Sequence, residues 1–231
     1  MTMIISDTTS GLSKKIANEN GIILIPQQVI FENEVFTDDS LLQPDEFVEK
    51  LRKSTSIPKT AAPLFQLYFP YFSEAEKNNE PVLILCPTGK MSGTIRSAET
   101  ARMEFPKLDI RIIDTQTIAG CLGSLSIIAR RMVKQGRPID DIESEINKLI
   151  PLSHTFFVVD TLEYLKKGGR IGAAKALLGE LLQVKPILQI KDGMAAPYEQ
   201  ERTKKKAINR MVEIVCEQVN THVEPHLCVM H

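Results

Sequence analysis

Short apolar runs alternate with stretches of helical periodicity over residues 1–152. Residues 82–86, Val-Leu-Ile-Leu-Cys, form an unbroken apolar run that is typical of a buried strand, and from Ile95 onward apolar residues recur at helical spacing. Short strands followed by a polar turn and a helix are also predicted at residues 3–6 and 110–114. Because strands that alternate with helices require crossover connections, we predict an α/β sandwich with a mainly parallel sheet.

Proline and small residues mark further features of this part of the chain. Pro70 interrupts a helical stretch that begins at Pro63, so a kink or a stop is expected near Phe69. Residues 54–62 are predicted to form a loop. Further helices are predicted at residues 44–53, 118–135 and 140–150. The small residues that open the second of these helices indicate that another helix or a ligand packs very close to it.

The pattern changes near residue 153. Asp192-Gly193 lies between two apolar stretches and is typical of a tight hairpin, which implies antiparallel strands. The hairpin strands are expected at residues 184–190 and 195–200, helices at 173–182 and 203–220, and the start of a strand at 227–230. We therefore predict two α/β domains, residues 1–152 with a mainly parallel sheet and a smaller one, residues 153–231, with antiparallel strands. Because the chain stops inside an apolar stretch, the second domain is expected to be incomplete.

Composition limits the classes of function. The chain has 231 residues, of which 43% are hydrophobic, and a net charge of −1 with acids and bases interleaved, so nothing indicates nucleic-acid binding. The sequence opens without the pattern of a signal peptide, and no apolar stretch approaches the length of a membrane span. Transient contact with a membrane surface stays compatible with the sequence.

Cysteine spacing gives no sign of a disulfide framework, and the histidines give only a weak sign of a metal site. The four cysteines are far apart and form no Cys-x-x-Cys pair, which suits a reducing compartment. The spacing of His222, His226 and His231 could ligate zinc, but these histidines flank a proline and lack cysteine or carboxylate partners in a zinc-binding pattern. We therefore predict a cytoplasmic protein without a metal site.

The loop after the central predicted strand holds the clearest chemical signal. Thr88, Gly89, Ser92, Gly93 and Thr94 are small or carry hydroxyl groups, and they lead into a predicted helix. The first amides of a helix lack partners and carry a partial positive charge, so this loop can bind a carboxylate or a phosphate without a cationic side chain. The alternative is that Ser92 or Thr94 only caps the helix. The loop lacks both the Walker spacing and a Gly-x-Gly-x-x-Gly motif, which disfavours nucleotide binding.

Two further polar turns begin at Asp7 and Asp114, and ligands bind beyond the carboxyl ends of strands in such sheets. Ser6, Asp7 and Ser92 leave a hydrolase or an acyltransferase acting on a small acyl or lipid substrate as an alternative function. A nucleophilic serine needs a positioned base, however, and the four histidines lie outside every hydroxyl-rich loop. Binding is therefore favoured over catalysis, and no catalytic residue is assigned.

Several motifs together resemble the DegV family, and the resemblance runs through essentially the whole chain. The most specific motif is LEYLKKGGRIG at residues 162–172. The others are SDTTSGL at 6–12, TAAP at 60–63, TGKMSGTIRSA at 88–98, IIDT at 112–115, LLQVKPIL at 181–188 and ERTKKKA at 201–207. Members of that family are two-domain bacterial proteins that hold one fatty acid in a tunnel between the domains, and some present its carboxylate to a fatty acid kinase, which makes an acyl phosphate. The resemblance implies a lipid-binding protein with a long-chain fatty acid as ligand, no cofactor, and a fatty acid kinase as partner.

The resemblance also implies roles for single residues. The carboxylate would contact the hydroxyl groups of Thr60 and Ser92 and the amides around Gly93 and Thr94, which agrees with the anion site expected from the loop. This chain departs from the family after Thr60, where it has Ala-Ala instead of the common Ser-Gln. This departure leaves fewer polar side chains to line the site.

Apolar residues of the C-terminal part are candidates for the tunnel, although their helical and strand spacing fits an ordinary core equally well. They are Ile171, Leu177, Leu178, Leu181, Leu182, Ile187 and Leu188. About fifteen methylene-sized groups at ~0.8 kcal/mol each outweigh a hydrogen bond of ~0.5–1.5 kcal/mol, so the tail should dominate affinity and the hydroxyl groups should set orientation. Arg170 could brace the junction between the domains or face the kinase, and Arg202 together with Lys204–Lys206 could dock the kinase. For Lys204–Lys206, which follow Arg202, a solvated helix face is the alternative interpretation.

Overall fold

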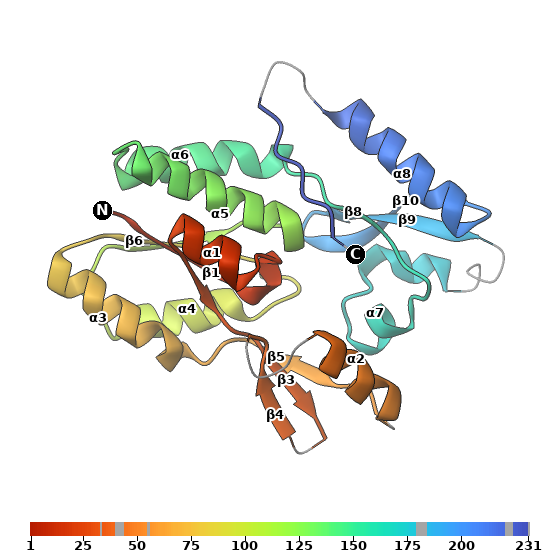
Figure 1. Ribbon diagram of the computed structural model, residues 1–231, viewed down its shortest axis with the longest axis horizontal. Coiled ribbons are helices and arrows are strands. Elements are labelled where there is room, and N and C mark those ends of the chain that lie inside the picture. The colour runs from red at the N-terminus through yellow and green to blue at the C-terminus, as the bar shows by residue number, and fades with distance from the viewer. Residues whose placement is uncertain (33, 40–43, 55, 179–183, 220–223, 231) are drawn as a thin grey trace. The chain divides into compact units, whose positions relative to one another are not determined.

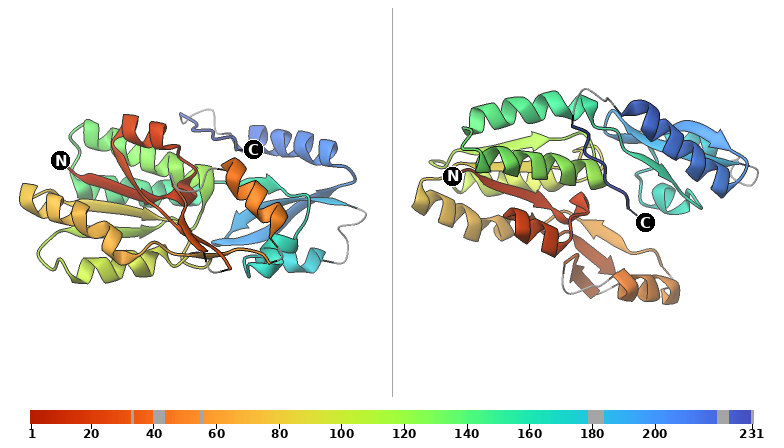
Figure 2. Two further views of the ribbon diagram at one scale, coloured as in Figure 1. Left: turned by 60° about the horizontal axis from the view of Figure 1, so that its bottom comes forward. Right: turned by 45° about the horizontal axis from the view of Figure 1, so that its top comes forward.

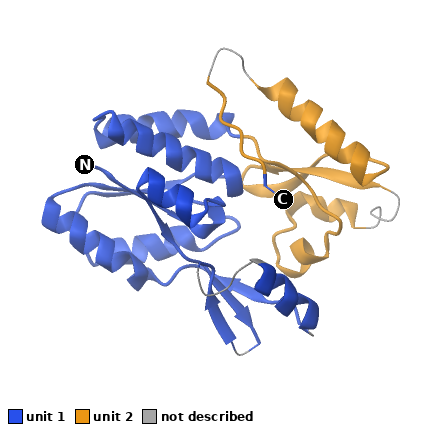
Figure 3. Ribbon diagram, in the orientation of Figure 1, with its two compact units in different colours: residues 1–153, 230–231 blue, residues 154–229 orange. Residues whose placement is uncertain are grey.

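The computed structural model of the chain (Figure 1) describes residues 1–32, 34–39, 44–54, 56–178, 184–219 and 224–230. The chain divides into two compact units, residues 1–153 with 230–231 and residues 154–229 (Figure 3). Each unit has its own sheets and its own apolar clusters.

A four-stranded sheet forms the centre of the first unit. Its strands are β1 (Met3–Asp7), β2 (Ile22–Ile25), β6 (Val82–Cys86) and β7 (Ile110–Asp114), in the order β2-β1-β6-β7. Every pair of neighbours is parallel, which confirms the mainly parallel sheet predicted from the sequence. All five residues of β6 are buried, as expected for a strand with both faces covered.

Helices cover both faces of this sheet (Figures 1 and 2). Ile4, Leu83 and Leu85 face a core formed with α1 (Lys14–Asn20), α5 (Ala119–Lys134) and α6 (Ile139–Leu149). Ile5, Ile84 and Cys86 point the other way, into a core formed with α3 (Phe69–Asn78) and α4 (Thr94–Met103). This division follows the alternation of side chains along a strand.

A small antiparallel sheet extends the first unit beyond β2. It consists of β3 (Gln28–Phe31), β4 (Glu34–Thr37) and β5 (Lys59–Ala61), in the order β4-β3-β5. Phe47 of α2 (Pro44–Lys53) packs edge-on against Phe31. The prediction of a loop over 54–62 was wrong at β5, because Lys59 and Thr60 are exposed and leave no apolar alternation to mark a strand.

Proline divides the next helical stretch as expected. A 3₁₀ helix, η2 (Phe65–Tyr68), is followed directly by α3, and Pro70 lies in the first turn of α3, where it removes no helical hydrogen bond. Two more 3₁₀ turns belong to this unit, η1 (Thr8–Ser10) and η3 (Ile150–Leu152). The break near Phe69 is therefore confirmed, but the helix expected from Pro63 is a 3₁₀ helix that begins at Phe65, and the α-helix starts at Phe69.

The second unit is built on the antiparallel sheet β10-β9-β8. Its strands are β8 (Phe156–Val158), β9 (Lys185–Lys191) and β10 (Met194–Glu201), and Asp192-Gly193 forms the predicted hairpin turn with φ angles of 50° and 73°. Helix α8 (Lys204–Gln218) packs on one face of the sheet. Residues of α7 (Glu163–Lys167) and η4 (Gly172–Leu177) contribute to the cluster that contains Leu188, which lies on the other face.

Two predicted elements of this unit differ in the structure. The helix expected over 173–182 is a 3₁₀ helix at Gly172–Leu177, and residues 179–183 lie outside the described part of the chain. Ala174 and Leu177 are its buried residues, and the three-residue spacing of a 3₁₀ helix cannot be told from an α-helical face over so short a run. Residues 227–230 form no strand; the side chains of Leu227, Val229 and Met230 are exposed. An apolar run needs a sheet edge to pair with before it becomes a strand.

Among the described residues, none of the helices combines the length and the apolar character that crossing a membrane would need. No group of histidine, cysteine or acidic side chains in the described residues is suited to holding a metal ion.

Candidate functional site

The three polar turns after β1, β6 and β7 meet at the carboxyl edge of the parallel sheet, as predicted. The N–H of Thr88 donates to the carbonyl of Thr117 at 2.9 Å, and the N–H of Gly89 donates to Oδ2 of Asp114 at 3.2 Å. The hydroxyl of Thr94 donates to Oδ2 of Asp7 at 2.6 Å. Residues 87–94 are thus bonded to both of the other turns, through Thr88 and Gly89 on one side and through Thr94 on the other.

Asp7 is the buried centre of this region. The side chain ends β1 and has no exposed surface. Oδ1 accepts hydrogen bonds from the N–H of Thr9, at 2.9 Å, and from the Thr9 hydroxyl. Oδ2 accepts from Nε2 of Gln27 and from the hydroxyl of Thr94, both at 2.6 Å. Four donors from three segments of the chain therefore converge on one carboxyl group.

Burial and hydrogen bonding act on this carboxyl in opposite directions. Removal from water raises the pKa of Asp7 above its ordinary value, and the hydrogen bonds from Thr9, Thr94 and Gln27 offset part of that effect. The protonated form of Asp7 is therefore more accessible than it is for a carboxyl in water.

The amino end of α4 offers backbone donors. Gly93 is the N-cap residue and supplies no side-chain cap. Ser92 Oγ accepts weakly from the N–H of Thr94, at 3.3 Å, so it provides only part of the capping considered from the sequence. The first amides of a helix have no partner within the helix, and the helix dipole adds a partial positive charge at this end. Because the side chain of Ser92 is only partly buried, this end of the helix can receive an anion.

The segment that contains Thr60 packs against the same end of α4. Ser97 Oγ donates to the carbonyl of Pro63 at 2.6 Å. A Cβ added at Gly93 would lie 3.2 Å from the Cβ of Ala62, so glycine permits this close approach. Thr60 is exposed on β5, where it pairs with Val29. The structure therefore brings together the two segments that carry the predicted carboxylate-binding residues.

Thr94 has a different environment from the other predicted residues. Its side chain is 1% exposed. Its hydroxyl bonds to Asp7, accepts from Nε2 of Gln27 at 2.8 Å and lies 2.9 Å from Ser92 Oγ. Only its backbone can therefore be offered to a ligand directly. Sequence reasoning missed Gln27 because no local pattern marks a glutamine between two short strands.

The serines considered for catalysis have other partners. Ser6 is buried and donates its hydroxyl to the carbonyl of Leu85 at 3.1 Å. Ser92 bonds to Thr94, and in the described part of the chain neither serine is hydrogen-bonded to a histidine. His154 stacks on Phe156 in the other unit.

The predicted tunnel residues do not form one surface. Ile171, Leu177 and Leu188 are buried in one cluster, against which Leu178 packs. Ile187 is buried on the opposite face of the sheet, beneath α8. Leu181 and Leu182 lie outside the described residues. Ile187 therefore belongs to a different core from the other described candidates.

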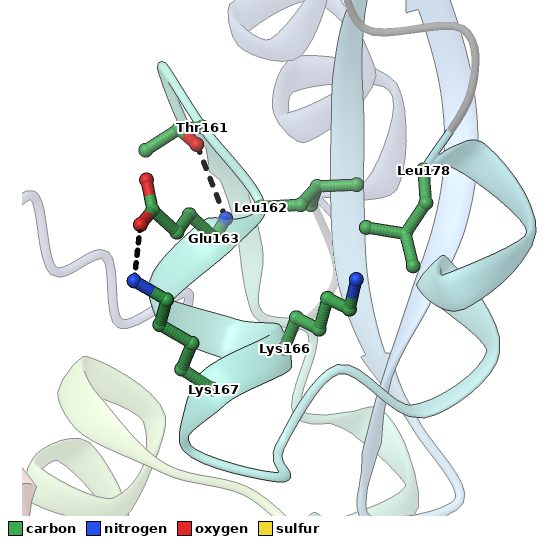
Figure 4. A pocket seen from close by; sticks show the side chains of 6 residues that line it. All are labelled: Thr161, Leu162, Glu163, Lys166, Lys167 and Leu178. Carbon is green, nitrogen blue, oxygen red and sulfur yellow. Dashed lines mark hydrogen bonds and ion pairs between the residues drawn. The ribbon is translucent and has the colours of Figure 1, made fainter.

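A pocket of about 310 Å³ lies next to Leu178 in the second unit (Figure 4). It is lined by Thr161, Leu162, Glu163, Lys166, Lys167 and Leu178. Glu163 and Lys167 form an ion pair of 2.5 Å across one turn of α7. With two apolar side chains in its lining, this pocket alone cannot bury a long hydrocarbon tail.

The two docking candidates differ in how their guanidinium groups are engaged. Arg170 is half-buried, and its Nη1 donates to the carbonyl of Gly168 at 2.6 Å. Arg202 is exposed and forms no ion pair within the described residues. Lys204, on the next helix, pairs with Asp160 at 2.8 Å. Of these cations, Arg202 is the best placed to meet a partner.

Comparison with known proteins gives consistent matches. A family model described as an uncharacterised protein of the DegV family matches residues 1–231. Protein DegV of Bacillus subtilis (strain 168) is 29% identical over 229 residues, which cover 99% of this chain and 82% of that protein.

Solved structures show the same similarity. One, described as fatty acid binding of a DegV family protein from Thermus thermophilus, has a TM-score of 0.87 at 31% identity and covers 94% of this chain and 77% of that one. A second, described as a stearic acid-binding protein from Eubacterium ventriosum, has a TM-score of 0.86 at 27% identity, with 94% and 76% covered.

Proposed function

The chain belongs to the DegV family, and we propose that it binds a single long-chain fatty acid without itself making or breaking a covalent bond. The similar proteins from Thermus thermophilus and Eubacterium ventriosum, both described as fatty acid binding, support this assignment. The observation that carries it in this chain is the amino end of α4, where Gly93 supplies no side-chain cap and the neutral hydroxyl of Ser92 is only partly buried.

We assign the carboxylate to the hydroxyl groups of Thr60 and Ser92 and to the amides of Gly93 and Thr94. Ala62 and Pro63, which follow Thr60, contact Gly93 and Ser97 at the amino end of α4. The partial positive charge at the helix end favours an anion, and hydroxyl donors fix its orientation. Because the side chain of Thr94 is buried, only its backbone amide is assigned to the carboxylate.

The hydrocarbon tail supplies most of the affinity in this proposal. About fifteen methylene groups at ~0.8 kcal/mol each exceed what a few net hydrogen bonds of ~0.5–1.5 kcal/mol can provide. Ile171, Leu177, Leu178 and Leu188 belong to one apolar cluster that can contribute to the tail's environment. The tunnel implied by the sequence stays a prediction.

We further propose that the bound acid is presented to a fatty acid kinase. A carboxylate held by hydroxyl and amide donors, without a buried arginine, keeps oxygen lone pairs available for attack on a phosphoryl group. The exposed guanidinium of Arg202 is the proposed docking contact. Arg170, which is engaged with the carbonyl of Gly168, is the weaker candidate.

A comparison of a fatty acid with the alcohol of equal length tests the head-group assignment. Ser92→Ala should weaken binding of the acid about 10- to 100-fold, since a hydrogen bond to a charged group contributes ~1.5–3 kcal/mol, and should change binding of the alcohol much less. The matched control is Ser144→Ala, at an exposed position of α6. Equal losses for both ligands, or no loss for the acid, would contradict the assignment.

A further inference from the structure

A continuous series of hydrogen-bonded oxygen atoms connects the buried carboxyl of Asp7 with the proposed carboxylate site. Asp7 Oδ2 lies 2.6 Å from Thr94 Oγ1, and Thr94 Oγ1 lies 2.9 Å from Ser92 Oγ. At the buried end of this series, Nε2 of Gln27 donates to Asp7 Oδ2 at 2.6 Å and to Thr94 Oγ1 at 2.8 Å. Of the residues in this series, only Ser92, at its outer end, is proposed to contact the ligand through its side chain.

Counting donors and acceptors at Thr94 shows how the two ends of this series are linked. The hydroxyl of Thr94 has one proton and two lone pairs, and it has three partners. The amide of Gln27 donates to it and occupies one lone pair. Of the remaining partners, Asp7 and Ser92, one must therefore receive the proton of Thr94 and the other must donate its own.

The charge of Asp7 decides which arrangement holds. An ionised Asp7 has no proton, so Thr94 donates to Asp7 and Ser92 donates to Thr94. Ser92 Oγ also accepts from the N–H of Thr94, so it has only one lone pair left for a ligand. An Asp7 that carries its proton on Oδ2, the oxygen next to Thr94, donates to Thr94. Thr94 then donates to Ser92, and the proton of Ser92 becomes available to a ligand. A fatty acid carboxylate only accepts hydrogen bonds, so it is complementary to the second arrangement alone.

We propose that Asp7 and the carboxyl group of the bound fatty acid hold one proton between them, through the coupled orientation of the Thr94 and Ser92 hydroxyl groups. This inference rests on the proposed function. Either Asp7 carries the proton and Ser92 donates to a carboxylate, or Asp7 is ionised and the ligand, as a carboxylic acid, donates to Ser92. An ionised fatty acid that binds to a chain with an ionised Asp7 therefore takes up a proton from solvent. Asp7 acts here as a positioning residue.

The surroundings of Asp7 favour this sharing. Its carboxyl is buried, which makes the charged form costly. Among the described residues, the charge of Asp7 acts on two titratable groups, Tyr68 of η2 and Cys86 of β6. Burial raises the pKa of both groups, and the negative charge of Asp7 raises both further. Neither group is cationic, so neither offsets a negative charge on Asp7. Two ionised carboxyl groups separated by two hydroxyl groups would also repel each other, and one shared proton removes that repulsion.

Calorimetry can count this proton directly. Decanoate is a soluble, ionised ligand at neutral pH, and its binding heat can be measured in buffers with different ionisation enthalpies between about pH 5.5 and about pH 8.5. For the wild-type chain, proton uptake per bound ligand should rise with pH toward about one, as Asp7 of the free protein becomes ionised. Uptake near zero throughout this range, with decanoate bound, would overturn the proposal.

Two variants identify the group that takes up the proton. Asp7→Asn cannot ionise and can donate to Thr94 permanently, so proton uptake should fall to near zero and affinity should lose its pH dependence. Thr94→Val removes the hydroxyl that links Asp7 to Ser92, so it should also abolish proton uptake. The test then remains available if one of the two variants does not fold. Thermal unfolding shows whether each variant is folded. Uptake that persists in both folded variants would refute the assignment to Asp7. A wild-type chain that binds no fatty acid at all would instead refute the proposed function.

Discussion

Asp7 connects three segments that are far apart in the sequence. Its partners Thr9, Gln27 and Thr94 lie 2, 20 and 87 positions away. The carboxyl group thereby joins the end of β1 to the segment after β2 and to the first residue of α4. A change at this residue should affect both the stability of the first unit and the geometry around Ser92.

The stability of the chain should depend on the ionisation of Asp7. Burial raises the pKa of Asp7 in the folded state above the ordinary value of 3.8. The stabilisation that the protonated carboxyl gives the folded state is therefore fully present below about pH 3.8 and is lost as the pH rises through the folded-state pKa. Asp7→Asn cannot ionise and avoids this loss. The free energy of unfolding of the variant, relative to the wild type, should therefore increase as the pH rises from about 4 to about 7.

Urea denaturation at several pH values measures this difference. Asp38→Asn, at an exposed position of the same unit, controls for the removal of one acidic group. A relative stability of Asp7→Asn that falls as the pH rises would show that the ionised carboxyl is the form that stabilises the fold.

The residues of the site could be predicted from the sequence only in part. Ser92, Gly93 and Thr94 form a local signal, because small and hydroxyl residues before a helix point to an anion site. Gln27 and the orientation of Thr94 gave no such signal. Their hydrogen bonds depend on a sheet that brings β1 and α4 together, and tertiary contacts of that kind are not encoded in local spacing.

At the level of elements, apolar periodicity identified the buried strands and the amphipathic helices. Strand β6 and helix α2 have the predicted boundaries, because every residue of β6 is buried and α2 has proline at its first position. Strand β5 was missed because two of its three residues are exposed. Pairing with β3, and not burial, makes that segment a strand.

The small residues at the start of α5 accommodate η1, the 3₁₀ turn that follows Asp7. A Cβ added at Gly123 would lie 2.7 Å from the carbonyl oxygen of Ser10 and 3.0 Å from Cδ2 of Leu12. These contacts explain the close packing that the sequence indicated at this position, where a neighbouring turn occupies the space and no ligand is needed.

Gly123→Ala should therefore destabilise the chain. Alanine in place of a helical glycine normally stabilises by ~1 kcal/mol, but overpacking against a backbone oxygen costs ~1–3 kcal/mol. We expect a net loss of about 1 kcal/mol in urea denaturation. Ser144→Ala, on the exposed face of α6, is the control and should not lower stability. A gain of ~1 kcal/mol in Gly123→Ala would mean that η1 moves freely away from α5.

At the level of the whole molecule, the proposed function divides between two surfaces. The head-group donors lie in the first unit, and the proposed docking cation Arg202 lies in the second. The proposed lipid binding and the proposed presentation to a kinase should therefore be separable by mutation, because different residues are assigned to them.

Arg202→Glu should lower the rate of acyl phosphate formation with a fatty acid kinase and ATP by at least about tenfold, because reversing a docking charge replaces attraction with repulsion. Fatty acid affinity should stay within about twofold of the wild type, since Arg202 is exposed and outside the head-group site. Lys15→Glu, at an exposed cation of the first unit, is the matched control. Unchanged kinase turnover in Arg202→Glu would remove this residue from the docking role.

The central claim is that this chain holds a fatty acid and is not its catalyst. Mass spectrometry of an organic extract of the purified chain, prepared without detergent, tests it most directly. The account predicts an unmodified long-chain fatty acid in an amount equal to that of the protein. Wild-type protein that yields no fatty acid, and binds none when it is supplied, would contradict the account.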